Sequence, residues 1–139
     1  MNLQEYQKRR QLILSEEKKY RELCTTCLQP SFGCYCPHVQ QFDSRISFVI
    51  LIHPIEVKRR IATGRMSHLC LKNSHLIMGQ DYSQNAEVQK LIEHPEFHSV
   101  ILYPGQKSVN VSELSHEQRE EKFLTNKKLR ILVIDGTWA

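Results

Sequence analysis

Four cysteines stand close together near the start of the chain, in the pattern C-x2-C-x6-C-x-C: Cys24, Cys27, Cys34 and Cys36. Four thiolates at this spacing can converge on one tetrahedral metal ion, for which zinc is the usual occupant. Two disulfides and a redox Cys-x-x-Cys pair are the competing interpretations. A reducing compartment disfavours the first, and the second does not need four cysteines. Because four thiolates leave no open coordination position, we expect zinc to build structure here rather than to catalyse.

A second set of chemically capable residues follows the apolar runs of the sequence. The groups are His53-Pro54-Ile55-Glu56, Tyr103-Pro104-Gly105 and Asp135-Gly136-Thr137-Trp138. The carboxyl ends of parallel strands meet at one edge of a sheet, where α/β proteins bind ligands. We therefore expect these groups to share one site. Each group also has an ordinary structural explanation, since an aspartate after a strand is often a helix cap.

The third feature is a run of cations. Between Val57 and Lys72 the sequence has five cations and no acid: Lys58, Arg59, Arg60, Arg65 and Lys72. Such a run favours a partner that carries phosphate, although a solvated helix face explains the charge equally well. Backbone N–H groups around Gly64 could hold an anion while Arg59, Arg60 or Arg65 reach phosphate.

The elements that must position these residues alternate along the chain. Apolar, β-branched runs predict strands, and amphipathic patterns between them predict helices. The predicted strands are 46–53, 74–79, 99–105 and 129–135, and the predicted helices are 55–72, 85–94 and 112–124. We expect a break near Thr63-Gly64, and Ser115 with Gln118 fits a capping box. The alternation predicts an α/β fold, a parallel sheet with flanking helices joined by right-handed crossovers.

The predicted organisation has three parts: a helical arm over residues 1–23, a four-cysteine zinc knuckle over 24–38 and an α/β domain over 39–139. The composition, with 40% apolar residues, 24% charged residues and a net charge of +4, is that of an ordinary globular protein. No stretch approaches the roughly 20 apolar residues that span a bilayer. The N-terminus also lacks the apolar centre of a signal peptide. We therefore expect no membrane contact and a cytoplasmic location.

Taken together, the motifs resemble those of the DTW-domain proteins, the tRNA-uridine aminocarboxypropyltransferases. The resemblance runs from about Cys24 to Ala139 and rests on four signatures in the family's order. They are the four cysteines, His53-Pro54-x-Glu56-x2-Arg59, Thr63-Gly64-Arg65 and Asp135-x-Thr137-Trp138. Many members have asparagine just before Thr-Gly-Arg, where this chain has Ala62, which removes one hydrogen-bonding amide.

The resemblance implies that S-adenosylmethionine is the co-substrate and tRNA the partner. A uridine imide nitrogen would attack the methylene beside the sulfonium and receive the 3-amino-3-carboxypropyl group, with release of methylthioadenosine. The imide proton must leave, and Asp135 is the matching position for the carboxylate base. The implied cofactor-binding residues are Tyr103, Pro104, Gly105, Thr137 and Trp138, and the implied RNA-binding residues are Arg59, Arg60 and Arg65. The implied fold is similar to the SPOUT methyltransferases, a Rossmann-like sheet with a C-terminal knot.

Family members continue for several dozen residues beyond the Asp-x-Thr-Trp signature, and those residues supply much of the knotted cofactor site. We therefore expect this chain to be a truncated form without the knot, and to be weak or inactive as an enzyme alone. Apolar surface near residues 131–138 would then be exposed, so self-association through the last strand is a further expectation. Two other functions stay open: a zinc-containing RNA-binding module without catalysis, and an RNA methyltransferase that uses the same donor.

Overall fold

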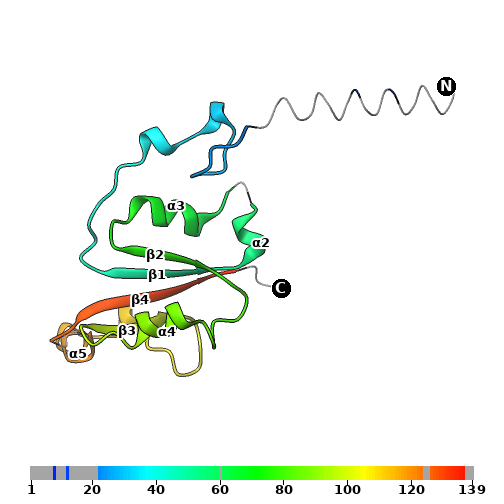
Figure 1. Cartoon of the computed structure of the whole chain (residues 1–139). Coiled ribbons are helices and arrows are strands. Elements are labelled where there is room, and N and C mark those ends of the chain that lie inside the picture. Colours follow the sequence, from blue (N-terminus) through cyan, green and yellow to red (C-terminus); the bar gives the residue numbers. More distant parts are fainter. Residues whose placement is uncertain (1–7, 9–11, 13–21, 60, 124–125, 137–139) are drawn as a thin grey trace. The chain divides into compact units, whose positions relative to one another are not determined.

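The structure is a computed structural model, and it describes residues 8, 12, 22–59, 61–123 and 126–136. The chain divides into two compact units, Met1–Val39 and Gln40–Ala139 (Figure 1). Most of the helical arm predicted over residues 1–23 lies outside the described residues. The predicted division into three parts therefore stays a prediction.

The first unit contains the cysteine segment, which is built from tight turns. It includes two short 3-10 helices, η1 (Ser31–Gly33) and η2 (Cys36–His38). The N–H of Leu28 donates to the carbonyl of Cys24 at 2.8 Å, and Leu28 itself has the left-handed φ of 57°. These turns fold the segment back on itself, as its proline and glycine content predicted.

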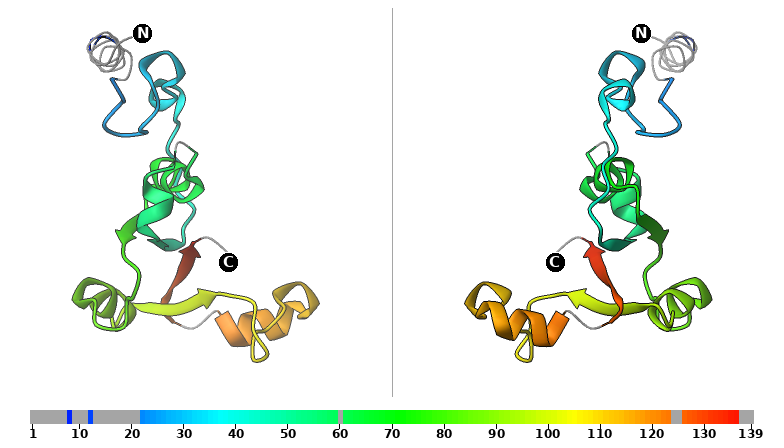
Figure 2. Two further views of the ribbon diagram at one scale, coloured as in Figure 1. Left: turned by 90° about the vertical axis from the view of Figure 1, so that its right-hand side faces the viewer. Right: turned by 90° about the vertical axis from the view of Figure 1, so that its left-hand side faces the viewer.

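The second unit is built on a four-stranded sheet in which every pairing is parallel. Its strands are β1 (Ser47–Ile52), β2 (Ser74–Met78), β3 (Phe97–Leu102) and β4 (Lys128–Asp135), in the order β2-β1-β4-β3 (Figures 1 and 2). The predicted α/β fold with a parallel sheet is confirmed. β3 begins two residues before the predicted start and ends at Leu102. Tyr103 and Pro104 therefore follow the strand, and Pro104 has no N–H to offer the ladder.

Helices connect the strands. They are α2 (Pro54–Val57) and α3 (Thr63–Cys70) after β1, α4 (Ala86–Ile92) after β2, and η3 (Val111–Glu113) with α5 (His116–Phe123) after β3. The break in the predicted 55–72 helix comes before Thr63, because Ala62 is extended, with φ −106° and ψ 105°. The predicted capping box is confirmed: Ser115 Oγ accepts from the N–H of Gln118 at 3.2 Å, and Gln118 Oε1 accepts from the N–H of Ser115 at 2.9 Å.

α3 and α4 lie on opposite faces of the sheet (Figures 1 and 2). The alternation along β1 explains this arrangement, because successive side chains of a strand point to opposite faces. The face toward α4 carries the buried cluster of Val49, Leu51, Ile77, Val88 and Leu132. Burial of each such side chain stabilises the fold by about 1.5–3 kcal/mol. Ile50, between two members of this cluster, points to the α3 face instead.

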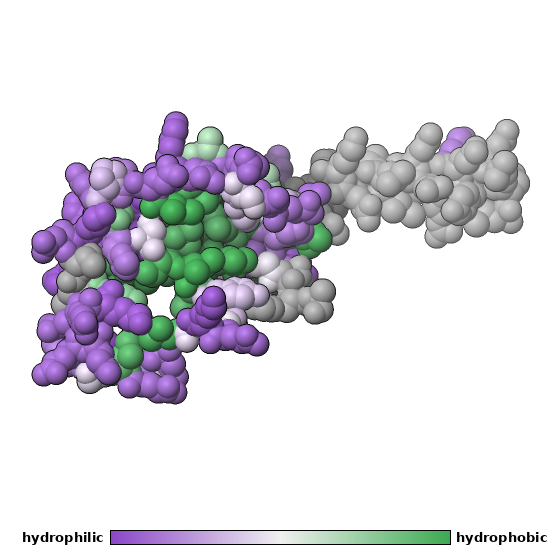
Figure 3. Space-filling view, turned by 90° about the horizontal axis from the view of Figure 1, so that it is seen from below, coloured by the Kyte–Doolittle hydropathy of each residue, from purple (hydrophilic) through white to green (hydrophobic). Residues whose placement is uncertain are grey.

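The cover of the sheet is incomplete over β3 and β4. Ile101 is 57% exposed, Leu102 68% and Ile134 47%. The face seen in Figure 3 accordingly has uncovered apolar surface at its centre, bordered by polar side chains. The expected exposure near the last strand is therefore present at Ile134. Among the described residues, no helix is long and apolar enough to cross a membrane.

Candidate functional site

The carboxyl ends of the strands meet at one edge of the sheet. Asp135 is the last residue of β4, and its carbonyl accepts the N–H of His53, just past β1, at 2.9 Å. On the other side of β1, the N–H of Gly79 donates to the carbonyl of Ile52 at 3.1 Å. β3 flanks β4, with Leu102 opposite Val133. The groups that follow the strands therefore start from a common edge, as the sequence predicted.

The carboxylate of Asp135 is bound to the start of α3. Its Oδ2 accepts the backbone N–H of Gly64, the second residue of α3, at 2.9 Å. Ala62, the N-cap residue, provides no side-chain cap. Asp135 therefore caps α3 from a different element, and its negative charge is favourable beside the positive end of the helix dipole. We expected backbone N–H groups around Gly64 to bind an anion. In the structure, the N–H of Gly64 binds the carboxylate of Asp135.

Gly64 is required at its position by the closeness of this approach. A Cβ atom there would collide with Oδ2 of Asp135 and lie 3.0 Å from Cγ2 of Ile50. Gly64 is buried and its φ is not positive, so the requirement is for space and not for backbone freedom. Only glycine lets the helix start reach the strand-end carboxylate.

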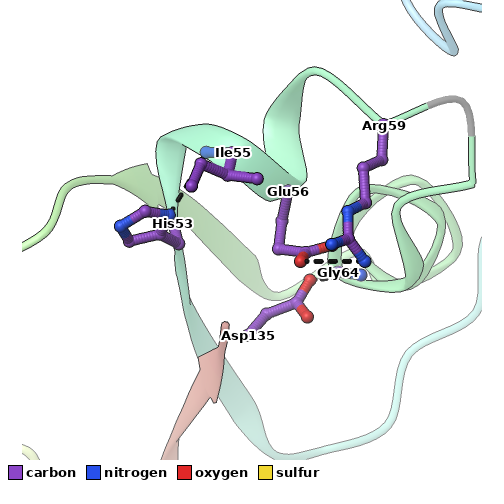
Figure 4. A network of polar contacts seen from close by, with 6 residues as sticks. All are labelled: His53, Ile55, Glu56, Arg59, Gly64 and Asp135. Atoms are coloured by element: carbon purple, nitrogen blue, oxygen red, sulfur yellow. Dashed lines mark hydrogen bonds and ion pairs between the residues drawn. The ribbon is translucent and has the colours of Figure 1, made fainter. Parts of the chain in front are cut away.

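The helix α2 brings a second carboxylate to this region. His53 caps α2 through Nδ1, which accepts the N–H of Ile55 at 3.2 Å, so the neutral ring carries its proton on Nε2. Glu56 is 8% exposed, and its Oε1 lies 3.3 Å from Nη1 of Arg59. In Figure 4 the side chains of Glu56 and Asp135 point toward one another near the start of α3. The site thus has two acids, Glu56 and Asp135, and the sequence predicted a role only for Asp135.

A hollow of about 220 Å³ lies beside Asp135 on the α3 face of the sheet. Its lining residues are Phe48, Ile50, Thr63, Gly64, Ser67, Leu71, Val133, Ile134 and Asp135. Most of these side chains are apolar, and the hydroxyl of Thr63 and the carboxylate of Asp135 are among the few polar groups. An apolar hollow with a few polar groups is the usual form of a small-molecule site, although such sites are typically larger, about 300–1,000 Å³.

The predicted cofactor-binding residues are partly placed by the structure. Tyr103 is 48% exposed, and its carbonyl accepts the hydroxyl of Ser108 at 2.7 Å. The carbonyl of Gly105 accepts the N–H of Ser108 at 2.9 Å, so the segment after β3 closes into a turn. Thr137 and Trp138 lie outside the described residues. The cofactor-binding role of all these residues, Pro104 included, stays a prediction.

The predicted RNA-binding arginines have different environments. The side chain of Arg59 is 53% exposed and remains at the surface while it pairs with Glu56. Arg65 is 6% exposed, and its guanidinium donates to the carbonyl of Val57. Arg65 is thus buried instead of lying at the surface, and its RNA-binding role stays a prediction. Arg60 lies outside the described residues.

The four cysteines of the first unit form one cluster, in which all Sγ atoms lie within 4.8 Å of one another. The Sγ atoms of Cys24 and Cys36 are 3.8 Å apart, and those of Cys27 and Cys34 are 3.6 Å apart. Four sulfurs bound to a tetrahedral zinc at 2.3 Å would be about 3.8 Å apart. These separations fit a metal site and are far from the roughly 2.05 Å of a disulfide. No disulfide joins these four cysteines, so the disulfide interpretation is not supported.

Backbone hydrogen bonds lower the pKa of one of these thiols, that of Cys24. Hydrogen bonds from the backbone of Cys27 and Thr26 lower the pKa of Cys24 to about 6, which favours the thiolate that zinc binds. Burial, together with hydrogen bonds to the other thiols, raises the pKa of Cys36 to about 12. Four thiolates cannot accumulate here without a cation, and a metal ion would supply the missing positive charge.

Comparison with known proteins supports the resemblance noted above. Residues 21–139 match the family described as DTW domain. The chain is 27% identical over 133 residues to tRNA-uridine aminocarboxypropyltransferase 2 of Drosophila melanogaster, covering 91% of this chain and 49% of that protein. It is 27% identical over 131 residues to tRNA-uridine aminocarboxypropyltransferase 2 of Mus musculus, covering 89% of this chain and 41% of that protein.

The chain thus spans about half the length of the curated relatives it matches. No solved structure matches it. The SPOUT-like fold therefore stays a prediction, while the α/β sheet itself is confirmed.

Proposed function

The chain belongs to the DTW domain family, and from this premise we propose that it is the DTW domain of an enzyme that transfers the 3-amino-3-carboxypropyl group of S-adenosylmethionine to a uridine of tRNA. The observation that carries the proposal is the hydrogen bond between the N–H of Gly64 and the carboxylate of Asp135. It joins the Thr-Gly-Arg signature to the Asp-x-Thr-Trp signature, although 71 residues separate them. Two family signatures thereby become parts of one site.

In this proposal Asp135 accepts the imide proton of the uridine. Gly64 fixes Oδ2, and no partner for Oδ1 is recorded within residues 22–59, 61–123 and 126–136. A carboxylate held by one oxygen keeps the other oriented for proton transfer, which typically contributes a factor of about 10²–10⁴ to a rate. The hollow beside Asp135 is lined mostly by apolar side chains.

The hollow and the segment after β3 are our candidates for the donor site. S-adenosylmethionine supplies an activated methylene carbon when bound. Thr63 and Ser67 offer hydroxyl groups in the hollow, while Tyr103, Pro104 and Gly105 follow the neighbouring strand. Thr137 and Trp138 follow Asp135 after Gly136 and complete the proposed donor site. The task of these residues is to orient a flexible arm toward the uridine.

Arg59 is our candidate for contact with an anionic group, either a tRNA phosphate or the carboxylate of the donor. Glu56 holds the Arg59 guanidinium from one side. Because Arg59 is about half exposed, its remaining N–H groups can bind an incoming anion. Glu56 acts here as a positioning residue.

Zinc is the metal that we propose for the cysteine cluster, with Cys24, Cys27, Cys34 and Cys36 as its ligands. The 3.6 and 3.8 Å separations of their sulfurs support this assignment. We further propose a cytoplasmic location, and self-association through the exposed apolar residues of β3 and β4. Sedimentation velocity tests the last point. A sedimentation coefficient that rises with concentration supports it, and a monomer at all concentrations contradicts it.

The function is tested by incubating the protein with unmodified tRNA and S-adenosylmethionine, digesting the RNA and weighing the nucleosides. A uridine that gains the mass of an aminocarboxypropyl group supports the proposal. A gain of a methyl group supports a methyltransferase instead. Binding of tRNA without any gain supports an RNA-binding module.

A further inference from the structure

A second hollow opens at the opposite end of the strands from Asp135. It has a volume of about 520 Å³ and is lined by the first residues of the strands and the segments before them. Arg130 lines it near the start of β4, five residues before Asp135. At about 3.3 Å per residue, roughly 16 Å of strand separates this hollow from the candidate site. None of the roles proposed above uses it.

The hollow contains a buried guanidinium that has no acidic partner. Arg130 is 3% exposed, and its Nε donates to Oγ of Ser47 at 3.2 Å. Its Nη1 donates to the carbonyl of Leu91, and its Cζ lies 3.6 Å from the centre of the Phe97 ring. No carboxylate pairs with Arg130 in the part of the chain that the structure describes. Burial of an uncompensated charge is costly, and burial lowers the pKa of Arg130.

One nitrogen of this guanidinium remains available to a ligand. The recorded contacts of Arg130 use Nε and Nη1, which leaves Nη2 without a partner among the described residues. Among the described residues, every fully buried side-chain nitrogen and oxygen has a hydrogen-bond partner. Nη2 is therefore not fully buried, and the hollow that Arg130 lines is where a ligand can reach it.

The rim of the hollow adds further positive charge. Arg45, Lys72 and Lys128 line it, and all three are exposed. The lining residues include one acid, Asp43, whose Oδ1 accepts the N–H of Arg45 at 2.8 Å and the amide of Asn73 at 2.7 Å. The lysines and arginines that line the hollow outnumber this acid four to one.

The remaining ion pair of the rim is weak. Nζ of Lys128 lies 3.8 Å from Oε2 of Glu96, with both side chains about two-thirds exposed or more. An ion pair as exposed as this contributes little to stability, so Lys128 can leave Glu96 and bind a ligand instead.

The turn that presents Arg45 is also unusual. Arg45 has a φ of 60°, in the left-handed region that favours glycine. Such a conformation persists only where the surroundings fix it, and here the carboxylate of Asp43 holds the N–H of Arg45. The acid of this hollow therefore fixes the backbone of a basic residue at the rim.

We propose that this hollow binds a phosphate group of the RNA backbone, with Arg130 at its base and Arg45, Lys72 and Lys128 at its rim. The chemistry is phosphate recognition by a guanidinium nitrogen, Nη2 of Arg130, with further cations at the rim. The inference rests on the proposed function only in naming tRNA as the RNA. It gives the enzyme a second contact with its substrate, at the other end of β4 from the reacting base.

Charge removal at the rim tests the proposal without disturbing the buried Arg130. The double variant Lys72→Gln, Lys128→Gln loses two rim cations. The matched control, Lys90→Gln with Lys122→Gln, loses two exposed cations on α4 and α5. Binding of an unmodified tRNA transcript is followed by fluorescence anisotropy over a range of salt concentrations.

We expect the rim variant to bind roughly tenfold more weakly. Its salt slope, log K against log salt concentration, should fall by about 0.7–0.9, the amount that one lost phosphate contact removes. The control should keep the slope of the unaltered protein. Equal slopes for the two double variants would overturn the proposal, as would the absence of tRNA binding at low salt.

The source of the phosphate is tested on the unaltered protein. The Nε–H resonance of Arg130 is followed by NMR during titration with inorganic phosphate and then with tRNA. Displacement of bound phosphate by tRNA supports the RNA assignment. Phosphate that stays bound in the presence of saturating tRNA assigns the hollow to a free anion and overturns it.

The test of this hollow is independent of the test of the proposed enzymatic function. The variant Asp135→Asn lies at the far end of β4 and should keep the salt slope of the unaltered protein even if it transfers nothing. A chain that shows the rim effect but no transfer product would refute the enzymatic proposal and leave this one standing.

Discussion

The backbone N–H of Gly64 and the Oδ2 atom of Asp135 are joined by a 2.9 Å hydrogen bond between α3 and β4. The bond gives Asp135 two roles at once. It caps a helix whose own N-cap residue, Ala62, has no side chain that could do so. In our proposal it also accepts a proton from the substrate. Because the two roles need different chemistry, substitutions can separate them.

Replacement of Asp135 by asparagine or alanine should distinguish capping from catalysis. Asparagine caps a helix about as well as aspartate but is no base at neutral pH. We therefore expect Asp135→Asn to lose transfer by about 10²-fold or more with little loss of stability. Asp135→Ala should lose transfer and also about 1 kcal/mol of stability. Nucleoside mass analysis measures the first effect and urea unfolding the second. Transfer that survives in Asp135→Asn would show that Asp135 is not the base.

Gly64→Ala tests whether close contact between the helix start and the carboxylate is needed. The new methyl group would meet Oδ2 of Asp135 and Cγ2 of Ile50, so α3 must shift away from β4. Overpacking of this kind typically costs about 1–3 kcal/mol, and we expect transfer to fall with it.

Gly33→Ala is the matched control for this substitution, because nothing lies within 4 Å of a Cβ at that position. We expect Gly33→Ala to leave stability within about 0.5 kcal/mol of the unaltered protein. Equal stabilities for the two alanine variants would mean that the contact at Gly64 is not tight.

The sequence predicted the elements well because their signals are local. The β-branched run in β1 and the capping box formed by Ser115 and Gln118 each depend on residues a few positions apart. The same holds for the four cysteines, whose spacing predicted a cluster that the structure contains. The motif after each strand also predicted a shared edge, since parallel strands bring their carboxyl ends together.

The features that the sequence could not predict depend on distant partners. Arg65 looks like a surface cation in the sequence, yet its guanidinium reaches the carbonyl of Val57 and is buried. Arg130 stands in an apolar run and gave no signal of the cationic hollow that it lines. For Glu56 a signal was available, because Glu56 and Arg59 are three residues apart and form an ion pair on the α2 side of the site.

Removal of the metal should unfold the cysteine segment and leave the sheet intact. We expect the purified protein to contain a single zinc ion per chain, and Cys27→Ser to lose it, since Cys27 is fully buried in the cluster. Cys70→Ser is the control, because Cys70 lies in α3 outside the cluster, and it should retain zinc. Metal content is measured by mass spectrometry. Zinc retained by Cys27→Ser would contradict the assignment.

Ionisation of Tyr82 should lower the free energy of unfolding at alkaline pH. Its hydroxyl lies 3.0 Å from the carbonyl of Ile52 and 2.9 Å from that of Gly79, and so ties together the ends of β1 and β2. Burial raises the pKa of Tyr82 above its ordinary value of about 10. The unfolded chain therefore loses this proton first as the pH rises. The stability that Tyr82 contributes is present below about pH 10 and is lost as the pH rises through the raised pKa.

Tyr82→Phe isolates this contribution. The variant should be less stable than the unaltered protein by about 1 kcal/mol at pH 8, because the two carbonyls lose a donor. The difference should shrink above pH 10. Urea unfolding at a series of pH values measures both effects, and a difference that grows with pH would refute the explanation.

The central claim is that the reaction takes place at the edge of the sheet where Asp135 ends β4. The most direct test is to add millimolar S-adenosylmethionine to the ¹⁵N-labelled protein and to map the amide resonances that move, since NMR also detects weak binding. We predict that the amides of His53, Gly64 and Gly136 shift and saturate, while those of Lys72 and Asn73 at the opposite edge do not. Saturable shifts confined to that opposite edge, or none at all, would contradict the account.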